Sequence, residues 1–327
     1  MRAALFARCL AAAVLAILLF WTAAPALALP VFAHRYGLSC QDCHTTVPHL
    51  SPFGRAFAAN GFRLENARRT LPVAVKVNLA YSSDAETGLP KAVVDEVELL
   101  AGGTIGKHAN YFVEHYLVDG GESGHTRDAW VQLNGINAHL RVGQFTLPLP
   151  VDPETQRDTQ AHYLVYDQTV GENGFDFFDA HQGIEAYTVA RGFEAHLAAL
   201  RAGTMASISK TFDDGLALYA YRYQGQAFYR QGYGAGETVG KLHLVAVLQR
   251  GNDAAAASSG GFFETHYTFS PALMAVARYD SVWDALTGAE HQTVLGIVTR
   301  PARNMRFTIE DQITDRHTLN LGWLFAY

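Results

Sequence analysis

The residues best suited to do chemistry in this sequence are two cysteines and a histidine near the N-terminus. Cys40 and Cys43 are three positions apart, and His44 follows directly. This spacing is the attachment pattern of c-type haem, in which two thiols bond the vinyl groups of the porphyrin and the adjacent histidine is the proximal iron ligand. The sequence therefore predicts one covalent haem c, anchored by Cys40 and Cys43 and ligated by His44.

Three other interpretations of the Cys-x-x-Cys-His segment explain less of it. A zinc site would need further ligands at metal-binding spacing, and the chain has no second pair of cysteines. A thioredoxin-like redox pair would need a strand before it and a βαβ unit around it, and the sequence indicates neither. A structural disulfide suits an exported protein but leaves the following histidine unexplained.

The second axial ligand of the iron is less constrained. The three methionines beyond residue 30 lie far along the chain, which excludes a methionine ligand near the motif. His49 follows His44 by five residues and His34 precedes Cys40 by six, so either histidine is a candidate for the opposite face of the haem. Histidine on both faces would give a lower reduction potential than a His/Met pair. Water or a later histidine is also compatible with the sequence.

One short helix is expected directly after the motif. Ser51 can cap its N-terminus, Pro52 occupies a first-turn position that proline tolerates, and Gly61 provides a left-handed stop. Phe53 and Phe57 are four residues apart and therefore share one face of this helix. That face lies either against the porphyrin or against a neighbouring wall of the protein.

The segment before the motif has the organisation of an export signal. Arg2 and Arg8 supply positive charge, residues 10–21 are apolar, and Ala26-Leu27-Ala28 is a small-x-small cleavage site. We expect a cleaved signal peptide over residues 1–28. An uncleaved membrane anchor is the alternative, because the apolar stretch is almost long enough to span a bilayer.

Composition excludes several classes of protein. The chain has 327 residues, 49% of them hydrophobic and 17% charged, with a formal net charge of -6. Ample apolar content, low charge and scarce cysteine argue against a disordered chain, a coiled coil or a disulfide-stapled miniprotein. The mildly acidic balance offers no basic surface for a phosphate backbone, so nucleic acid is not an expected partner.

From residue 72 onward, apolar and polar residues alternate in segments of about ten residues separated by turns. The apolar faces include Val73, Val75, Val77, Leu79 and Tyr81; Leu140 and Val142; Leu242, Leu244 and Leu248; and Phe263, Tyr267 and Phe269. Such alternation is typical of a transmembrane β-barrel with an apolar exterior and a polar lumen, and a soluble sandwich is the alternative. Residues 317–327 favour the barrel, because a soluble edge strand seldom carries such a continuous apolar row to an aromatic terminus.

Strands are expected to start near residues 72, 93, 109, 126, 137, 182, 193, 203, 214, 226, 239, 260, 272, 290, 304 and 317. With sixteen strands, an even number, the chain enters and leaves the barrel on the periplasmic side. Fourteen strands is the alternative, because the sequence signal for the strands near 203 and 226 is weak. The predicted fold is all-β: an antiparallel transmembrane barrel of about sixteen strands over residues 72–327, preceded by a short helical haem segment over 29–71 that plugs the lumen.

The longest connection, from Thr146 to His181, is too long for a plain hairpin and is rich in acidic residues. It is either an acidic, partly infolded loop that attracts cations such as ferrous iron, or a solvated loop kept soluble by its charge. Four polar-face histidines either line the lumen or are wall residues with hydrogen-bond partners: His139, His196, His243 and His266.

The N-terminal segment carries a family resemblance. Residues 30–44, Pro-Val-Phe-Ala-His-Arg-Tyr-Gly-Leu-Ser-Cys-Gln-Asp-Cys-His, and residues 48–62, which include Pro-Phe-Gly-Arg-Ala-Phe, resemble the monohaem porin-cytochrome fusions of iron-oxidising bacteria. The resemblance implies one c-type haem at the N-terminus of an outer-membrane barrel, with electrons passing from extracellular Fe(II) to periplasmic carriers such as a soluble cytochrome c. Residues 140–145 with Pro148 also resemble a segment of phosphate-selective porins.

The expected function is electron transfer at the bacterial outer membrane, within outer-membrane lipid, with Fe(II):cytochrome c oxidoreductase activity as its enzymatic form. One alternative is a solute-conducting porin with a haem-bearing periplasmic appendage. The other is an exported haem sensor or structural plug.

Overall fold

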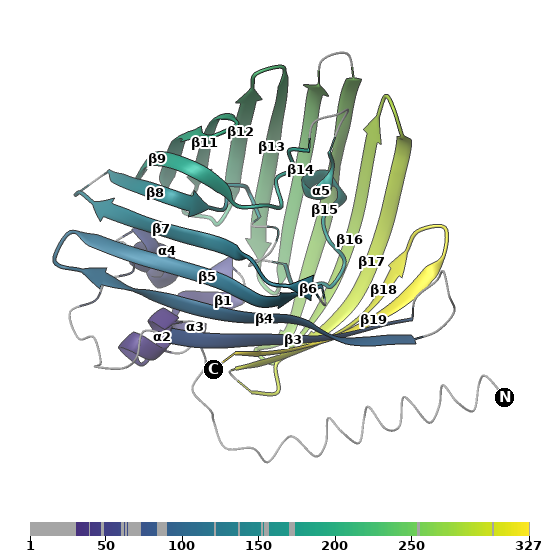
Figure 1. The fold of residues 1–327 in the computed structure, drawn as a ribbon. Helices are drawn as coiled ribbons and strands as arrows, with labels where there is room; N and C mark the ends of the chain where they lie inside the picture. The colour runs from purple at the N-terminus through teal and green to yellow at the C-terminus, as the bar shows by residue number, and fades with distance from the viewer. Residues whose placement is uncertain are drawn as a thin grey trace.

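The computed structural model describes residues 31–38, 40–46, 49–59, 62, 64, 73–83, 90–120, 122–136, 138–151, 153, 157–169, 174–253, 256–302 and 304–326. The predicted signal peptide lies outside these residues. Sixteen long strands form one closed antiparallel barrel (Figure 1). They are β3 (Val73–Ser83), β4 (Pro90–Ile105), β5 (Ala109–Asp119), β7 (Thr126–Asn134), β8 (His139–Phe145), β9 (His181–Ala190), β10 (Phe193–Leu200), β11 (Gly203–Thr211), β12 (Ala217–Gly225), β13 (Phe228–Val239), β14 (Leu242–Asp253), β15 (Ala256–Ser270), β16 (Leu273–Asp284), β17 (Gly288–Thr299), β18 (Met305–Ile313) and β19 (His317–Ala326).

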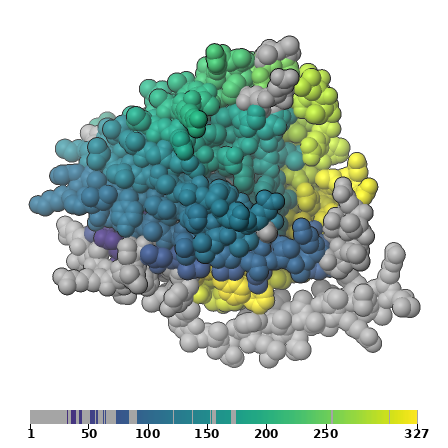
Figure 2. Space-filling view, in the orientation of Figure 1, coloured from purple at the N-terminus to yellow at the C-terminus, as the bar shows by residue number. Residues whose placement is uncertain are grey.

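Each of these strands pairs with its neighbours in sequence, and β19 closes the barrel by pairing with β3. The first strands (blue) and the last strands (yellow) accordingly lie side by side in Figure 2. The two-residue β6 (Glu122–Ser123) extends the edge of β5. The predicted number of sixteen is confirmed, and each observed strand begins within four residues of its predicted start.

The faces of the strands are inverted relative to a soluble protein. Leu197 and Leu248 on the outer face are 64% and 70% exposed, whereas Glu98 and Glu310 on the inner face are 0% exposed. An apolar exterior around a polar interior is the arrangement of a barrel that is embedded in lipid. The soluble sandwich is therefore the wrong alternative for this chain.

The two ends of the barrel differ in their connections. One end, here called the turn end, is closed by tight connections such as residues 106–108, 191–192 and 240–241. At residues 191–192, Arg191 and Gly192 both have positive φ, as the twist of a two-residue hairpin requires. The opposite end, here called the loop end, carries the longer connections over residues 84–89, 120–125 and 146–180. Barrels of this class keep short turns on the periplasmic side, so we assign the turn end to the periplasm, as predicted.

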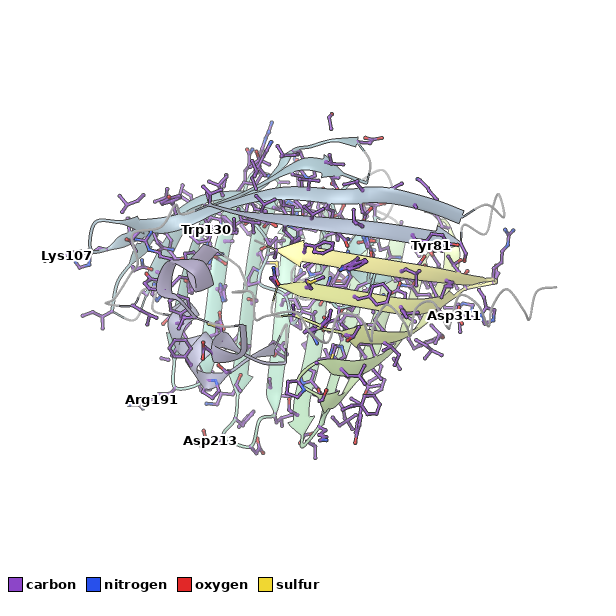
Figure 3. All side chains as sticks on the ribbon, turned by 90° about the horizontal axis from the view of Figure 1, so that it is seen from below. Tyr81, Lys107, Trp130, Arg191, Asp213 and Asp311 are labelled. Carbon is purple, nitrogen blue, oxygen red and sulfur yellow. The ribbon has the colours of Figure 1, made fainter. Side chains whose placement is uncertain are left out.

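Labelled residues in Figure 3 mark the two ends of the barrel. Lys107, Arg191 and Asp213 lie in connections at the turn end, and Tyr81 and Asp311 lie toward the loop end.

A small N-terminal unit lies at the turn end (purple in Figure 1). It comprises α2 (Val31–Tyr36), α3 (Cys40–Cys43), β1 (His44–Thr46), β2 (His49–Leu50) and α4 (Pro52–Ala59). A short helix inside the barrel, α5 (Leu164–Asp167), belongs to the connection between β8 and β9. Among the described residues, no helix is both long enough and apolar enough to cross a bilayer.

Candidate functional site

The Cys-x-x-Cys-His segment adopts a compact backbone. Cys40 and Cys43 begin and end the single turn of α3, and His44 opens β1. The antiparallel pairing of β1 with β2 places His44 opposite Leu50 and Thr46 opposite His49. Residues three apart on a helix lie on the same side, so the backbone presents both cysteines to one side, as a porphyrin attached through two thioethers requires. His34, the other candidate for the opposite face of the iron, lies in α2.

Helix α4 packs directly against the end of this segment. The predicted cap is present, because Ser51 Oγ accepts a hydrogen bond of 3.0 Å from the backbone N–H of Gly54. The backbone N–H of Ser51 donates to the carbonyl oxygen of Cys43 over 2.8 Å. A Cβ at position 54 would overlap that same carbonyl oxygen, so only glycine lets α4 approach the segment this closely.

An aromatic cluster connects α4 with α2. Phe57 is 6% exposed and makes edge-to-face contacts with Phe32, Tyr36 and Phe62 at centroid distances of 6.3, 5.6 and 5.6 Å. Phe53 stacks on Phe57 with centroids 6.0 Å apart but is itself 39% exposed. Of the two predicted roles for this face, Phe57 has the packing role, and the exposed ring of Phe53 leaves a free aromatic surface beside the motif.

Phe32 anchors the N-terminal unit inside the mouth of the barrel. Its ring lies 6.2 Å from that of Phe112 on the inner face of β5, and it packs against Ala74 of β3, as do Leu100 and Ala326. Arg35 adds a polar contact, since its Nη2 donates to Thr104 Oγ1 on β4 over 3.1 Å. The unit therefore sits on the inner wall formed by β19, β3, β4 and β5 at the turn end.

The residues around the motif fit a covalent haem on two observations. The backbone of α3 has the cysteine spacing and the following histidine that the attachment chemistry needs. In addition, the Nε–H of Arg35 is buried and has no hydrogen-bond partner among the described residues, so a donor is left for a group outside them. The haem itself, with Cys40, Cys43 and His44 as its attachment and ligand residues, stays a prediction.

The connection between β8 and β9 folds into the lumen. It leaves β8 at the loop end, yet Asp158 lies 2.9 Å from Arg300 and 3.4 Å from Arg306, which both stand at the turn end. Its aromatic residues return toward the loop end, where the ring of Phe175 stacks on Tyr223 of β12 at 3.8 Å. Of the two interpretations of this segment, infolding is correct for its described residues.

Arg278 on β16 is the central anchor of this infolded loop. It is 1% exposed, and its Nη2 donates to the carbonyl oxygens of Ala161 and His162 over 2.8 and 2.7 Å. Its Nε donates to Asp280 over 2.7 Å, and its guanidinium lies 4.2 Å from the ring centroid of Tyr163. Arg278 therefore contacts two consecutive backbone carbonyl groups and one aromatic ring of the infolded loop.

Carboxylates of other strands complete the attachment. Glu310 accepts hydrogen bonds from the backbone N–H groups of Gln160 and Ala161 over 2.6 and 2.8 Å. The hydroxyl of Tyr163 donates to Glu264 over 3.1 Å. Burial raises the pKa of Tyr163 well above its usual range, so this hydroxyl keeps its proton and remains a donor.

Three of the four acidic residues that the structure describes in the loop have partners within the protein. Asp158 pairs with two arginines, Asp167 lies 2.9 Å from the imidazole of His162, and Asp176 accepts from the backbone N–H groups of Phe178 and Asp179. Asp152, Glu154 and Glu172 lie outside the described residues.

A cavity of about 460 Å³ lies at the loop end between the barrel wall and the infolded loop. Four acidic residues line it, Asp95, Glu96, Asp119 and Asp179, together with His125, Arg127 and His162. His125 is 3.5 Å from Asp119 and stacks on Tyr116, so it is held in place from two sides. No group of three or more His, Cys, Asp or Glu residues within the described part of the chain is arranged to hold a metal ion.

The four barrel histidines named from sequence are wall residues with partners. Their nearest polar atoms belong to Asn134 for His139, Glu185 and Glu194 for His196, Thr238 for His243 and Glu264 for His266, all within 3.0 Å. The four histidines fall into two pairs: the rings of His243 and His266 lie 5.9 Å apart across β14 and β15, and His139 and His196 both stack on Tyr187.

The residues that hold the infolded loop in place were not predicted from the sequence. Arg278, Glu310 and Gln292 all face the lumen from strands far along the chain, and Gln292 Nε2 donates to the carbonyl oxygen of His162 over 2.6 Å. Two signals were available in the sequence. Charged residues occur at inward positions of the strands, and the acidic loop also contains five Phe and Tyr residues.

Comparison with known proteins identifies the fold. No family model and no curated protein matches the chain. Among solved structures, OmpT of Vibrio cholerae in its trimer form is 13% identical, with a TM-score of 0.61 over 79% of this chain and 99% of that chain. Salmonella typhi OmpF, in complex with daunomycin, is 11% identical with a TM-score of 0.62 over 78% and 97%.

An anion-selective porin from Comamonas acidovorans is 13% identical with a TM-score of 0.58, over 78% of this chain and 98% of that chain. The matched share corresponds in size to the barrel, and the apolar outer face agrees with the predicted outer-membrane location. The chain therefore has the fold of the bacterial outer-membrane porins, a closed antiparallel barrel of 16 strands.

Proposed function

We propose that this protein is an outer-membrane electron-transfer protein that carries one covalent haem c at the periplasmic mouth of its barrel. Its electrons would pass between an extracellular donor, with Fe(II) as the first candidate, and a periplasmic carrier such as a soluble cytochrome c. The observation that carries the proposal is the seating of the Cys40–His44 unit in the barrel mouth through the contact of Phe32 with Phe112. A detached appendage would not need an aromatic anchor on the inner wall.

A haem bound at this segment would supply one-electron transfer at a potential set by its axial ligands. The protein's own residues have separate tasks. Cys40 and Cys43 provide the two thiols, His44 the proximal nitrogen, and either His49 or His34 is the candidate for the opposite face. Gly54 lets α4 pack against the carbonyl of Cys43, which fixes the end of the attachment turn.

The attachment of the infolded loop inside the barrel supports electron transfer over free diffusion of solutes. The infolded loop crosses from the loop end to Arg300 at the turn end and is held by hydrogen bonds to β14, β15, β16, β17 and β18. Its rings pack with barrel residues in one buried apolar cluster that includes Tyr163, Tyr166, Phe175 and Phe177. An open porin needs a water-filled passage at this place.

The acidic cavity at the loop end supports a cationic donor. Four carboxylates around about 460 Å³ attract small cations from the outside. In β5, however, Asp119 at the cavity is seven residues from Phe112, which corresponds to about 23 Å along a strand. The cavity is thus an entry site, and the donor or its electron must still travel inward to reach the segment at the turn end.

A solute-conducting porin with a haem-bearing appendage is the second candidate. The fold similarity to OmpF and to the anion-selective porin favours it, since the match covers 97% and 98% of those two chains. The two candidates differ in what they require, since a porin conducts without haem and an electron-transfer protein does not depend on ion flow.

The deciding experiment uses the full protein purified from outer membranes and placed in oriented proteoliposomes. Covalent haem is measured by the pyridine haemochrome spectrum, and its reduction is followed after Fe(II) is added outside. We expect rapid reduction that is lost in His44→Ala, with Lys107→Gln as a surface control that keeps it. Covalent haem that stays oxidised while the vesicles leak small ions would overturn the electron-transfer proposal in favour of the porin.

A further inference from the structure

We propose that Arg35 binds a propionate of the haem attached at Cys40 and Cys43, and so couples the redox group to the barrel wall. This inference rests on the proposed function. It begins from an unusual feature of Arg35, whose Nε–H is buried and has no hydrogen-bond partner among the described residues. Leaving a buried donor of a charged group unsatisfied is costly, and such donors in native proteins are normally paired.

The position of the guanidinium is fixed from the barrel side. Its Nη2 donates to Thr104 Oγ1 over 3.1 Å, and Nη1 lies 3.0 Å from where a Cβ would stand at Gly103. The glycine at 103 therefore makes room for this side chain on β4. Thr104 takes one hydrogen of Nη2, and the buried Nε–H is left without an acceptor among the described residues.

No carboxylate of the described residues lies within ion-pair distance of Arg35, although it stands in the part-buried mouth of the barrel. The guanidinium fork matches a carboxylate better than any other anion of similar size, because two parallel N–H groups meet two oxygens. Haem carries two such carboxylates as its propionates. Arg35 lies in α2, five residues before Cys40, and α2 and α4 pack together through Phe32 and Phe57.

The two contacts of Arg35 give the pairing a structural role. Thr104 holds the arginine to the wall, and the arginine would hold the propionate. The haem would then be fixed to the barrel at one edge by charge and to α3 at the other by thioethers. Arg35 is thus a positioning residue for the redox group rather than a ligand of the iron.

A cation beside haem favours the reduced state, since reduction removes one positive charge from the iron centre. Removal of the Arg35 charge is therefore expected to lower the midpoint potential. For one charge at the effective dielectric of a part-buried site, we expect about a tenfold smaller ratio of reduced to oxidised haem at a fixed applied potential, or about 59 mV for a one-electron couple.

The test compares midpoint potentials of the full-length haem protein by spectroelectrochemistry, with haem content measured independently by the pyridine haemochrome. The variants are Arg35→Gln, Arg35→Lys and, as a matched control, Lys107→Gln. Lys107 is an exposed cation in the β4–β5 turn at the same end of the barrel (Figure 3). We expect a lowered potential in Arg35→Gln, a smaller decrease in Arg35→Lys, and no change in Lys107→Gln.

The outcomes separate this inference from the proposed function. Wild-type protein without covalent haem would overturn both. Wild-type levels of haem with an unchanged potential in Arg35→Gln would overturn the propionate pairing and leave the electron-transfer proposal intact. If Arg35→Gln does not assemble, Arg35→Met removes the same charge, and a potential identical to wild type in that variant would refute the pairing.

Discussion

Asp158 and Arg300 form a salt bridge of 2.9 Å between a connection that starts at the loop end of the barrel and a turn at the opposite end. The side chains are 1% and 15% exposed, so the pair is shielded from solvent inside the barrel. Its existence means that the infolded loop, which leaves the strand β8 at the loop end, reaches the turn end inside the barrel.

Asp158 provides the first prediction. Asp158→Arg places a third cation beside Arg300 and Arg306, and the repulsion is expected to loosen the loop and raise single-channel conductance in planar bilayers several-fold. Asp213→Arg, at an exposed turn, makes the same change of charge away from the lumen and is the control (Figure 3). Equal conductance of Asp158→Arg and wild type would show that the loop does not limit ion flow.

Arg278 is expected to be the most sensitive position of the lumen. Arg278→Met leaves Asp280 without its arginine and two loop carbonyls without this donor, and it removes one of the two basic partners of Glu264. Breaking a buried pair in this way costs about 3–5 kcal/mol of unfolding free energy. Urea titration read by the gel mobility of the folded barrel measures this loss.

The matched variant for that experiment is Arg201→Met, at an exposed turn of the loop end. A surface change of this kind is expected to stay within about 0.5 kcal/mol of wild type. If both variants lost the same stability, the loss would reflect arginine removal in general and not the loop anchor.

The contact of the outer face with lipid can be tested by placing a charge at two different depths in the membrane. Leu248 lies near the middle of β14 on the outer face, and Leu218 lies on the outer face of β12 beside the turn end. Leu248→Lys is expected to cost about 2–4 kcal/mol and Leu218→Lys only about 0–1 kcal/mol, because a charge is least tolerated at the bilayer midplane. Folding yields in lipid vesicles over a urea series provide the comparison, and equal costs would argue against membrane embedding.

The carboxyl group of Asp176 is expected to make the stability of the infolded loop depend on pH. Burial raises the pKa of this carboxyl from 3.8 to about 6, against the hydrogen bonds from Asp179 and Phe178 that lower it. The folded loop therefore binds more protons than the unfolded loop between about pH 4 and 6, so this contribution is present below that window and is lost as pH rises through about 6. Protease cleavage of the loop should accordingly be slower at pH 5 than at pH 7.

Asp176→Asn removes this titration and is expected to flatten the pH dependence of cleavage. Asp315→Asn, at an exposed turn between β18 and β19, serves as the control and should keep it. An unchanged slope in Asp176→Asn would assign the dependence to another group.

The barrel could be predicted from sequence because its physical signal is local. Each strand shows its faces by alternation, so the outward Phe263 and the inward Glu264 can be assigned without knowing their neighbours. The observed exposures of 50% and 3% confirm that assignment. Even the weak strands near 203 and 226 exist, as β11 and β13.

The loop was harder to predict because its position depends on residues far away in the sequence. Its acidic composition fitted solvent equally well, and the deciding partners are Arg278, Arg300 and Glu310, which are more than a hundred residues away. The haem segment could be predicted in part. Its attachment motif is recognised from three residues, but the contact of Phe32 with Phe112 joins two distant parts of the chain, and no sequence pattern links them.

The connections at the loop end also differ between the two halves of the barrel. From β10 onward they shrink to a few residues, as at 201–202, 226–227 and 285–287. In this half the mouth is therefore bounded by the ends of the strands and not by long loops. A donor that arrives from outside would meet these strand ends directly, whereas on the side of β3 to β9 it would first meet the longer connections.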